Sequence, residues 1–173
     1  MSNYKERLHK IKAFVFDVDG VLSSSLMNMT EDGTPIRTAN VKDGYALQYA
    51  MKRGYIVAVI TGADTTMVRN RCKIFEIELL YCKSANKLTD YEHFKQKHNL
   101  TDSEIVYMGD DLPDIPVLRQ AGVSCCPADA AHEVKEVVDY ISHINGGCGC
   151  VRDIIEQTMR AQDKWMTGEV FVW

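Results

Sequence analysis

The chain has 173 residues, of which 46% are hydrophobic and 25% charged, proportions typical of a folded globular protein. Its net charge of −4 argues against a nucleic acid partner, and no apolar run of about 18 residues predicts a membrane span. Residues 1–10 are polar and do not resemble a signal peptide, so we expect a cytoplasmic location. From the length we expect residues 1–173 to form a single domain.

Two aspartates follow the first predicted strand. Residues 11–16 form an apolar run that predicts a buried strand, and Asp17, Asp19 and Gly20 come directly after it. Two carboxylates this close resist joint ionisation, but a divalent cation between them offsets that penalty. With the cation in place, one carboxylate can attack a substrate and the other can transfer a proton. The alternative is a solvated turn, because Asp and Gly are both common in turns.

A β-hairpin is expected next, at about residues 24–40. Asp32 and Gly33 form its turn signal. The flanks carry Leu26, Met29 and Ile36 and are more apolar than those of a free hairpin. These side chains either pack on the body of the protein or contact another subunit, and we favour the subunit contact.

The rest of the chain alternates between predicted strands and helices. Strands are expected at residues 56–60, 79–82, 105–108, 123–126 and 140–142, and helices at residues 45–53, 65–75, 87–98, 112–120, 130–138 and 151–164. Asp64 is the expected N-cap of the helix at residues 65–75. This alternation predicts the α/β class, with a doubly wound, Rossmann-like parallel sheet and right-handed crossovers.

Polar groups follow several of the predicted strands, so they gather at the edge of the sheet where the carboxyl ends of the strands lie. Ligands of such sheets bind at this edge. The groups expected at or near this edge are Asp17, Asp19, Thr61, Lys87, Asp110, Asp111 and Asp114. Lys87 begins a helix, where it either points into solvent or faces an anion together with the helix N-terminus. A hydroxyl and an ammonium suit a phosphate, and the carboxylates suit Mg²⁺.

This set of groups predicts phosphoryl transfer, which needs an in-line nucleophile and neutralisation of charge. Asp17 would attack phosphorus to give an aspartyl-phosphate, while Asp19 would protonate the leaving alcohol and then activate water. A receiver domain of two-component signalling uses similar groups, but its acidic pair precedes the aspartate that accepts the phosphate. Here the Asp-x-Asp pair comes first and Asp110 with Asp111 follows the lysine, which argues against a receiver.

The six cysteines do not form a typical zinc motif. The pairs Cys125 with Cys126 and Cys148 with Cys150 are spaced more tightly than zinc ligands usually are. The sequence also shows no secretory signal, whose presence would favour disulfides. We therefore expect free thiols.

Four motifs resemble those of the haloacid dehalogenase superfamily: residues 17–22, residues 60–62, Lys87 and residues 109–114. The resemblance covers nearly the whole chain. It implies that Asp17 is the nucleophile, that Asp19 is the acid and base, and that Thr61, Gly62 and Lys87 contact the substrate phosphate. It also implies Mg²⁺ bound by Asp17, Asp110 and the backbone carbonyl of Asp19, with Asp111 and Asp114 behind these ligands.

Many members of this superfamily insert a cap domain after the first or second motif. Here residues 20–60 are filled by one hairpin and one helix, and residues 62–86 are too few for a cap. The chain therefore resembles the capless subfamily. In such a protein a neighbouring subunit would have to close the site.

Within that subfamily the chain is most similar to the 3-deoxy-D-manno-octulosonate 8-phosphate phosphatases, homotetramers of lipopolysaccharide sugar biosynthesis. The resemblance implies that the phosphorylated sugar acid is contacted by Asn40, Val41, Lys42, Asp43, Gly44 and Arg71. Arg71 is the candidate for the carboxylate of the sugar. In the C-terminal segment, residues 146–152 and 161–164 also resemble this group. The chain ends in a helix and tail, residues 151–173, and we expect the apolar tail from Gly168 to dock on the body or on a neighbour.

Two departures from the group leave the substrate open. Ala63 stands where the group often has an arginine, and Gln48 stands where it often has a basic residue. A nine-carbon sugar acid phosphate is therefore an alternative to the eight-carbon one. A non-catalytic regulatory domain of the same fold is a further alternative, disfavoured because Asp17 and Asp19 are both present.

Overall fold

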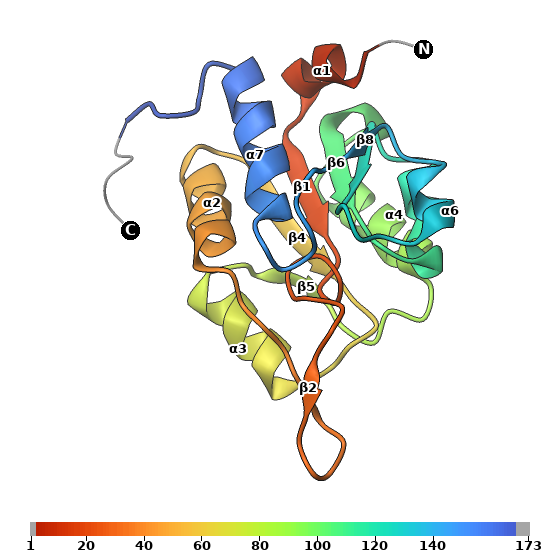
Figure 1. The fold of residues 1–173 in the computed structure, drawn as a ribbon. Helices are drawn as coiled ribbons and strands as arrows, with labels where there is room; N and C mark the ends of the chain where they lie inside the picture. The colour runs from red at the N-terminus through yellow and green to blue at the C-terminus, as the bar shows by residue number, and fades with distance from the viewer. Residues whose placement is uncertain (1–2, 169–173) are drawn as a thin grey trace.

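The computed structural model describes residues 3–168, and within them the largest feature is a six-stranded parallel sheet (Figure 1). The strand order is β5-β4-β1-β6-β7-β8. The strands are β1 Ala13–Phe16, β4 Ile56–Ile60, β5 Leu79–Tyr81, β6 Ile105–Met108, β7 Val123–Cys126 and β8 Tyr140–Ile141. The expected α/β class with a doubly wound parallel sheet is confirmed.

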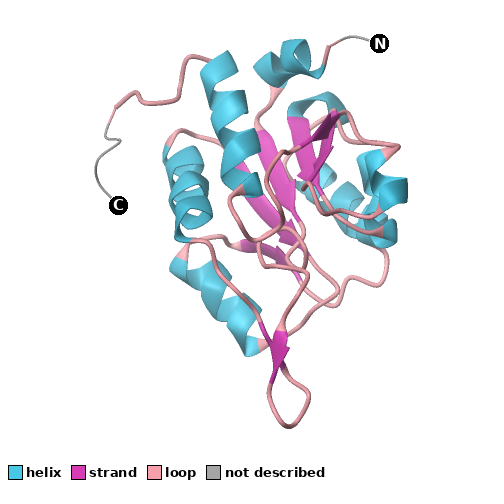
Figure 2. Ribbon diagram, viewed as in Figure 1, coloured by secondary structure: helices cyan, strands magenta, loops and turns pink. Residues whose placement is uncertain are grey.

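Helices cover both faces of this sheet (Figure 2). The α-helices of the described chain are α1 Tyr4–Arg7, α2 Val41–Lys52, α3 Thr66–Ile74, α4 Lys87–Lys97, α5 Ile115–Leu118, α6 His132–Lys135 and α7 Cys150–Ala161. Short 3₁₀ turns are η1 Leu8–Lys10, η2 Asp102–Glu104 and η3 Leu112–Asp114. The central strands β1, β4 and β6 are covered on both sides, so their residues are apolar without alternation.

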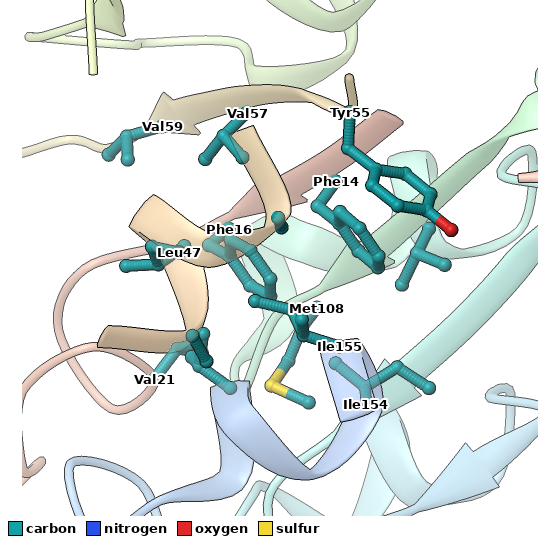
Figure 3. Packing of buried hydrophobic residues seen from close by; sticks show 14 of the residues in the cluster. Phe14, Phe16, Val21, Leu47, Tyr55, Val57, Val59, Met108, Ile154 and Ile155 are labelled. Carbon is teal, nitrogen blue, oxygen red and sulfur yellow. The ribbon is translucent and has the colours of Figure 1, made fainter. Parts of the chain in front are cut away.

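One hydrophobic core lies between the sheet and the helices α2, α3 and α7. Phe14 and Phe16 of β1 point to this side and are fully buried, as strand residues two apart must share a face. They pack with Leu47 of α2 and with Ile154 and Ile155 of α7 (Figure 3). This core holds the first strand in the middle of the molecule.

The other face of the sheet has its own core. Ala13 and Val15, the alternate residues of β1, pack there with Tyr91 and Phe94 of α4 and with Val117 of α5. Two cores on opposite faces fix β1 from both sides. The residues that follow β1 therefore leave a rigid strand.

Two helix starts differ from the sequence prediction. Helix α2 begins at Val41 rather than Tyr45, because the Asn40 side chain accepts hydrogen bonds from the backbone N–H groups of Lys42 and Asp43. Helix α3 is capped by Thr65 and not by Asp64, since the Thr65 side chain accepts from the Val68 N–H.

Three other predicted helices are shorter than expected. Residues 112–120 form η3 followed by the single turn α5, because two prolines in this segment lack the N–H that a continuous helix needs. Of residues 130–138 only α6 is α-helical. Helix α7 ends at Ala161, two residues before Asp163 takes a positive φ of 53°.

The hairpin extends away from the sheet at the lower end of the molecule in Figure 1. Its strands are short, β2 Asn28–Met29 and β3 Pro35–Ile36. Leu26 is 86% exposed, Met29 64% and Ile36 45%. These side chains do not pack on the body of their own chain, so of the two open alternatives the subunit contact is the one that the exposure favours.

The end of the described chain folds back onto helix α2. Trp165 is buried in an edge-to-face contact with Tyr49, and the Tyr49 hydroxyl donates a hydrogen bond to the Thr167 carbonyl oxygen. The apolar tail predicted to dock lies mostly at residues 169–173, outside the described residues. Among residues 3–168 no helix has the length and apolar character needed to cross a membrane. All six cysteines are free thiols, as expected.

Candidate active site

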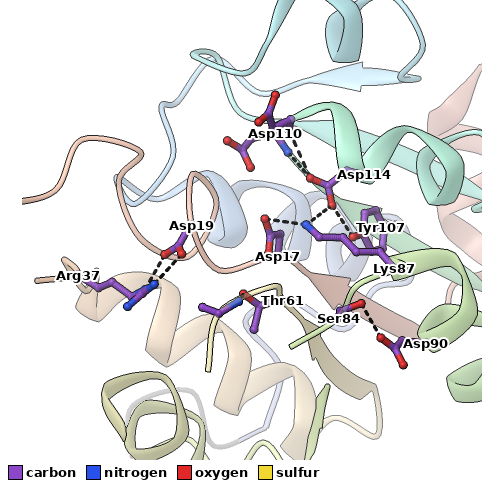
Figure 4. Close-up of polar contacts among 12 residues, drawn as sticks. Asp17, Asp19, Arg37, Thr61, Ser84, Lys87, Asp90, Tyr107, Asp110 and Asp114 are labelled. Carbon is purple, nitrogen blue, oxygen red and sulfur yellow. Dashed lines mark hydrogen bonds and ion pairs between the residues drawn. The ribbon is translucent and has the colours of Figure 1, made fainter. Parts of the chain in front are cut away.

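The three central strands bring the predicted residues to one edge of the sheet. Asp17 follows β1, Thr61 follows β4 and Asp110 follows β6, and β4 and β6 are the two neighbours of β1 (Figure 4). The backbone N–H of Asp17 donates to the Met108 carbonyl, which extends the β1–β6 pairing to the site. Asp17 and Thr61 are buried. Thr61 Oγ1 accepts a hydrogen bond from the Ala63 N–H at 3.1 Å, so its hydroxyl is held in place.

Lys87 is the first residue of α4, whose N-cap is Asn86. Its Nζ lies 2.9 Å from Asp17 Oδ2 and 2.7 Å from Asp114 Oδ1, and its side chain is 8% exposed. Lys87 therefore faces anions in the site and does not point into solvent. Burial lowers the pKa of Lys87, but the charges of Asp17 and Asp114 and the hydrogen bonds to them outweigh burial and leave that pKa raised.

Asp114 is fully buried and organises the loop after β6. Its Oδ1 accepts hydrogen bonds from Lys87 Nζ and the Tyr107 hydroxyl, at 2.7 and 2.6 Å. Its Oδ2 accepts from the backbone N–H groups of Asp110 and Asp111, at 3.2 and 3.3 Å. Asp114 thus joins the lysine to the loop that carries Asp110 and Asp111.

This close approach requires a glycine before Asp110. A Cβ on Gly109 would lie 2.3 Å from Asp114 Cγ, nearer than atoms can approach without displacement. A Cβ on Gly20 would likewise lie 1.9 Å from Asp110 Oδ2, and Gly20 also has a positive φ of 86°. The glycines of the first and fourth motifs therefore allow the carboxylates to converge.

The carboxylates are crowded enough to need a cation. Oxygens of Asp17, Asp110 and Asp114 all lie within 4.8 Å of one another. Burial, and then the charge of Asp114, raise the pKa of Asp17 to about 7 although Lys87 opposes the shift. Burial and the charges of Asp17 and Asp114 raise the pKa of Asp110 to about 7. Lys87 supplies one positive charge to three carboxylates, so the site retains an excess of negative charge.

The residues present fit a magnesium ion. Asp110 Oδ1 is buried without a hydrogen-bond partner, as expected of an oxygen reserved for a ligand. Both oxygens of Asp114 are already engaged, which leaves Asp17 and Asp110 to bind a cation. Oxygen donors of this kind are those that Mg²⁺ prefers. The backbone carbonyl of Asp19 stays a predicted third ligand.

Asp19 lies beside these carboxylates, but its own carboxylate pairs with Arg37 and not with Lys87. Arg37 of the hairpin forms two parallel hydrogen bonds with it, from Nε to Oδ1 at 2.6 Å and from Nη2 to Oδ2 at 2.8 Å (Figure 4). Arg37 is a site residue that sequence reasoning missed. Nothing local identifies it, because its partner Asp19 lies on another segment of the chain.

The segment predicted to contact the sugar makes contacts within the protein. Asn40 caps α2, and its carbonyl oxygen accepts from Arg71 Nη2 at 3.1 Å. The Arg71 guanidinium lies 4.5 Å from the centre of the Phe75 ring. A Cβ on Gly44 would lie 2.3 Å from that same ring, so packing requires the glycine. Val41 and Lys42 are exposed, and contact between this segment and a substrate stays a prediction.

Two other predicted residues, Gly62 and Asp111, are exposed beside the buried group. Gly62 has room around it, since a Cβ there would meet only the Ser84 carbonyl oxygen at 3.9 Å. Asp111 contributes its backbone N–H to Asp114. The structure thus brings Asp17, Lys87, Asp110 and Asp114 into direct proximity.

Asp43, one of the residues predicted to contact the sugar, forms a hydrogen bond within its own chain and affects the stability of the fold. It is buried, its Oδ1 accepts from the Arg152 N–H at 2.8 Å, and its Oδ2 has no hydrogen-bond partner. Burial raises its pKa to about 6, so the folded protein binds a proton more readily here than the unfolded chain does. Stability from this group is therefore lost as pH rises through that range.

We expect Asp43→Asn to change the pH dependence of unfolding. Asn keeps the acceptor for Arg152 but has no charge, so it avoids the cost of ionising a buried carboxyl. The free energy of unfolding of the variant should gain about 2 kcal/mol relative to the parent between about pH 4 and pH 7. Urea unfolding at several pH values measures this difference, and a difference that does not vary with pH would contradict the assignment.

Comparisons with known proteins show the family of the chain. The family described as haloacid dehalogenase-like hydrolase matches residues 71–152. The 3-deoxy-D-manno-octulosonate 8-phosphate phosphatase of Salmonella typhi is 36% identical over 158 residues, which cover 91% of this chain and 84% of that protein. The chain belongs to the haloacid dehalogenase-like hydrolases.

Within that family, two solved structures show the particular group that the chain is similar to. A 3-deoxy-D-manno-octulosonate 8-phosphate phosphatase from Yersinia pestis aligns with a TM-score of 0.90 and 32% identity, covering 94% of this chain and 88% of that one. The phosphatase of the same name from Moraxella catarrhalis aligns with a TM-score of 0.90 and 33% identity, covering 95% of both chains. That structure is a complex with a magnesium ion, a phosphate ion and a KDO molecule.

Proposed function

We propose that this protein is a Mg²⁺-dependent phosphatase that hydrolyses 3-deoxy-D-manno-octulosonate 8-phosphate in lipopolysaccharide sugar biosynthesis. The observation that carries the proposal is the group of Asp17, Lys87, Asp110 and Asp114 at the end of the central strands, in which Asp110 is half-buried and the other three are buried. The similarity to phosphatases of this name over 91% of the chain supports the substrate.

Asp17 is the proposed nucleophile. One of its oxygens bonds to phosphorus while the bond from phosphorus to the sugar oxygen breaks, and the electron pair stays on that sugar oxygen. Lys87 and Thr61 stabilise the charge on the phosphoryl oxygens. A magnesium ion held by Asp17 and Asp110 would neutralise further negative charge, at a place where burial and neighbouring carboxylates raise the pKa of both carboxyls to about 7.

Asp19 is the proposed acid and base. It gives a proton to the departing sugar oxygen, and afterwards takes one from the water that attacks the aspartyl-phosphate. Its side chain is 35% exposed, so it faces the side from which substrate and water arrive.

We also propose that the protein assembles as a homotetramer in which a neighbouring subunit covers the site. The support is the hairpin, whose apolar side chains Leu26, Met29 and Ile36 are exposed in the single chain. Light scattering reports the assembly. The cytoplasmic location expected from the sequence stays a prediction.

A nine-carbon sugar acid phosphate stays an alternative substrate, because Gln48 and Ala63 differ from the basic residues that the group often has at these positions. Gln48 is uncharged, and its Nε2 donates to the Ile74 carbonyl oxygen. Ala63 supplies only its backbone N–H, to Thr61. Neither position therefore offers a cation for the substrate.

Phosphate release from both substrates tests the proposal. We expect a kcat/KM at least about tenfold higher for the eight-carbon than for the nine-carbon sugar acid phosphate, with activity lost on chelation and restored by Mg²⁺. The reverse preference would assign the nine-carbon substrate. Full activity in chelator would contradict the metal requirement.

A further inference from the structure

Arg37 connects the hairpin to the acid and base of the site. It follows β3 directly, and its guanidinium meets both oxygens of Asp19, as described above. Two parallel hydrogen bonds fix the position of a carboxylate and also the plane in which it lies. No other hydrogen bond to the Asp19 carboxylate is found among residues 3–168, so Arg37 sets its orientation.

The guanidinium is the fixed member of this pair. The Arg37 side chain is 8% exposed, whereas that of Asp19 is 35% exposed. Arg37 Nη1 makes a third hydrogen bond, to Thr65 Oγ1 at 3.3 Å, and Thr65 is the N-cap of α3. The hairpin and α3 therefore hold Arg37 from two sides, while the carboxylate remains open to the site.

From this geometry we infer that Arg37 is a positioning residue that holds Asp19 where its carboxyl can reach the leaving oxygen of the substrate. The inference rests on the proposed phosphatase function. In the step concerned, the electron pair of the breaking bond between phosphorus and oxygen stays on the leaving oxygen, and the proton of Asp19 moves to it. A displacement of about 1 Å in such a group can cost about 10²-fold in rate.

Direct binding of a substrate anion is the competing role for this arginine. Three N–H groups of Arg37 are already engaged by Asp19 and Thr65, and most of the side chain is covered. A residue that binds substrate would affect KM for every phosphate ester. A residue that positions the acid lowers kcat/KM, which reports formation of the aspartyl-phosphate, only for those esters whose leaving group needs a proton.

Two substrates separate these roles. An alkyl phosphate, such as glycerol 2-phosphate or the sugar acid phosphate, must receive a proton on its leaving oxygen, whereas 4-nitrophenolate departs without one. With Mg²⁺ present, we expect Arg37→Gln to lower kcat/KM for the alkyl phosphate by about 10²-fold and for 4-nitrophenyl phosphate by less than about threefold. Arg37→Lys, which keeps the charge but not the parallel pair, should recover part of the loss.

Two further variants serve as controls. Arg160→Gln removes an arginine that pairs with Glu156 on the surface of α7, and should leave both substrates unaffected. Asp19→Ala combined with Arg37→Gln should be no slower than Asp19→Ala alone, because Arg37 then has nothing to position. Far-UV circular dichroism establishes that each variant is folded.

Equal losses on both substrates would overturn the inference, and so would a loss confined to KM. An additional loss from Arg37→Gln in the absence of the Asp19 carboxyl would also overturn it. Failure of the parent protein to hydrolyse any phosphate ester would instead contradict the proposed function, so the two failures are distinguishable.

Discussion

Asp17→Asn is expected to reduce turnover by about four orders of magnitude or more, the scale seen when a nucleophile is removed. Asparagine keeps the size of the side chain but cannot form the acyl phosphate. It also removes one of the two carboxylates that would hold the metal. The substitution relieves crowding among Asp17, Asp110 and Asp114, so the folded protein should be retained or stabilised.

Steady-state phosphate release and thermal unfolding measure both effects of this variant. The matched control is Asp64→Asn, which removes a carboxylate that pairs with Arg69 and Lys83 away from the buried group. We expect nearly full activity for the control. Substantial turnover by Asp17→Asn would rule out the aspartyl-phosphate route.

Asp114→Ala is expected to destabilise the protein strongly and also to lower activity. It removes the acceptor of four hydrogen bonds, those from Lys87, Tyr107 and the backbone N–H groups of Asp110 and Asp111. Breaking a buried ion pair of this kind costs about 3–5 kcal/mol. For a chain of this length that loss lowers the melting temperature by about 10 °C.

Two further variants show which contacts of Asp114 stabilise the protein. Tyr107→Phe removes one hydrogen bond to Asp114, for an expected loss of about 1 kcal/mol with activity retained. Asp114→Asn keeps an acceptor for Lys87 but turns N–H groups toward the N–H groups of the loop, so it should resemble Asp114→Ala. Calorimetry orders the three variants, and an Asp114→Ala protein as stable as the parent would contradict the central place of Asp114.

The strand ends could be predicted because their signals are local. Each central strand is an uninterrupted apolar run that stops at a polar residue, and parallel strands must end at one edge. Asp17, Thr61 and Asp110 therefore follow neighbouring strands at the same edge of the sheet, as predicted. The exact ligand set could not be derived from the pattern of residues, since several carboxylates follow the strands and only packing decides which ones converge.

Contacts between segments that are far apart in the sequence could not be predicted. Arg37 meets Asp19 only because the hairpin folds back over the first motif, and the hydrophobic periodicity of the sequence does not predict such a contact. Asp114, predicted to lie behind the metal ligands, also accepts four hydrogen bonds from the groups around it, because Gly109 lets it approach the chain. The start of α2 does have a local signal, because Asn40 is a good N-cap and begins the helix four residues before the predicted Tyr45.

Trapping the covalent intermediate tests the central claim most directly. During turnover with Mg²⁺, borohydride should reduce an aspartyl-phosphate to homoserine, and peptide mass spectrometry locates the product. We predict homoserine at position 17, dependent on substrate and absent in Asp17→Asn. Homoserine at another aspartate, or none during active turnover, would contradict Asp17 as the nucleophile.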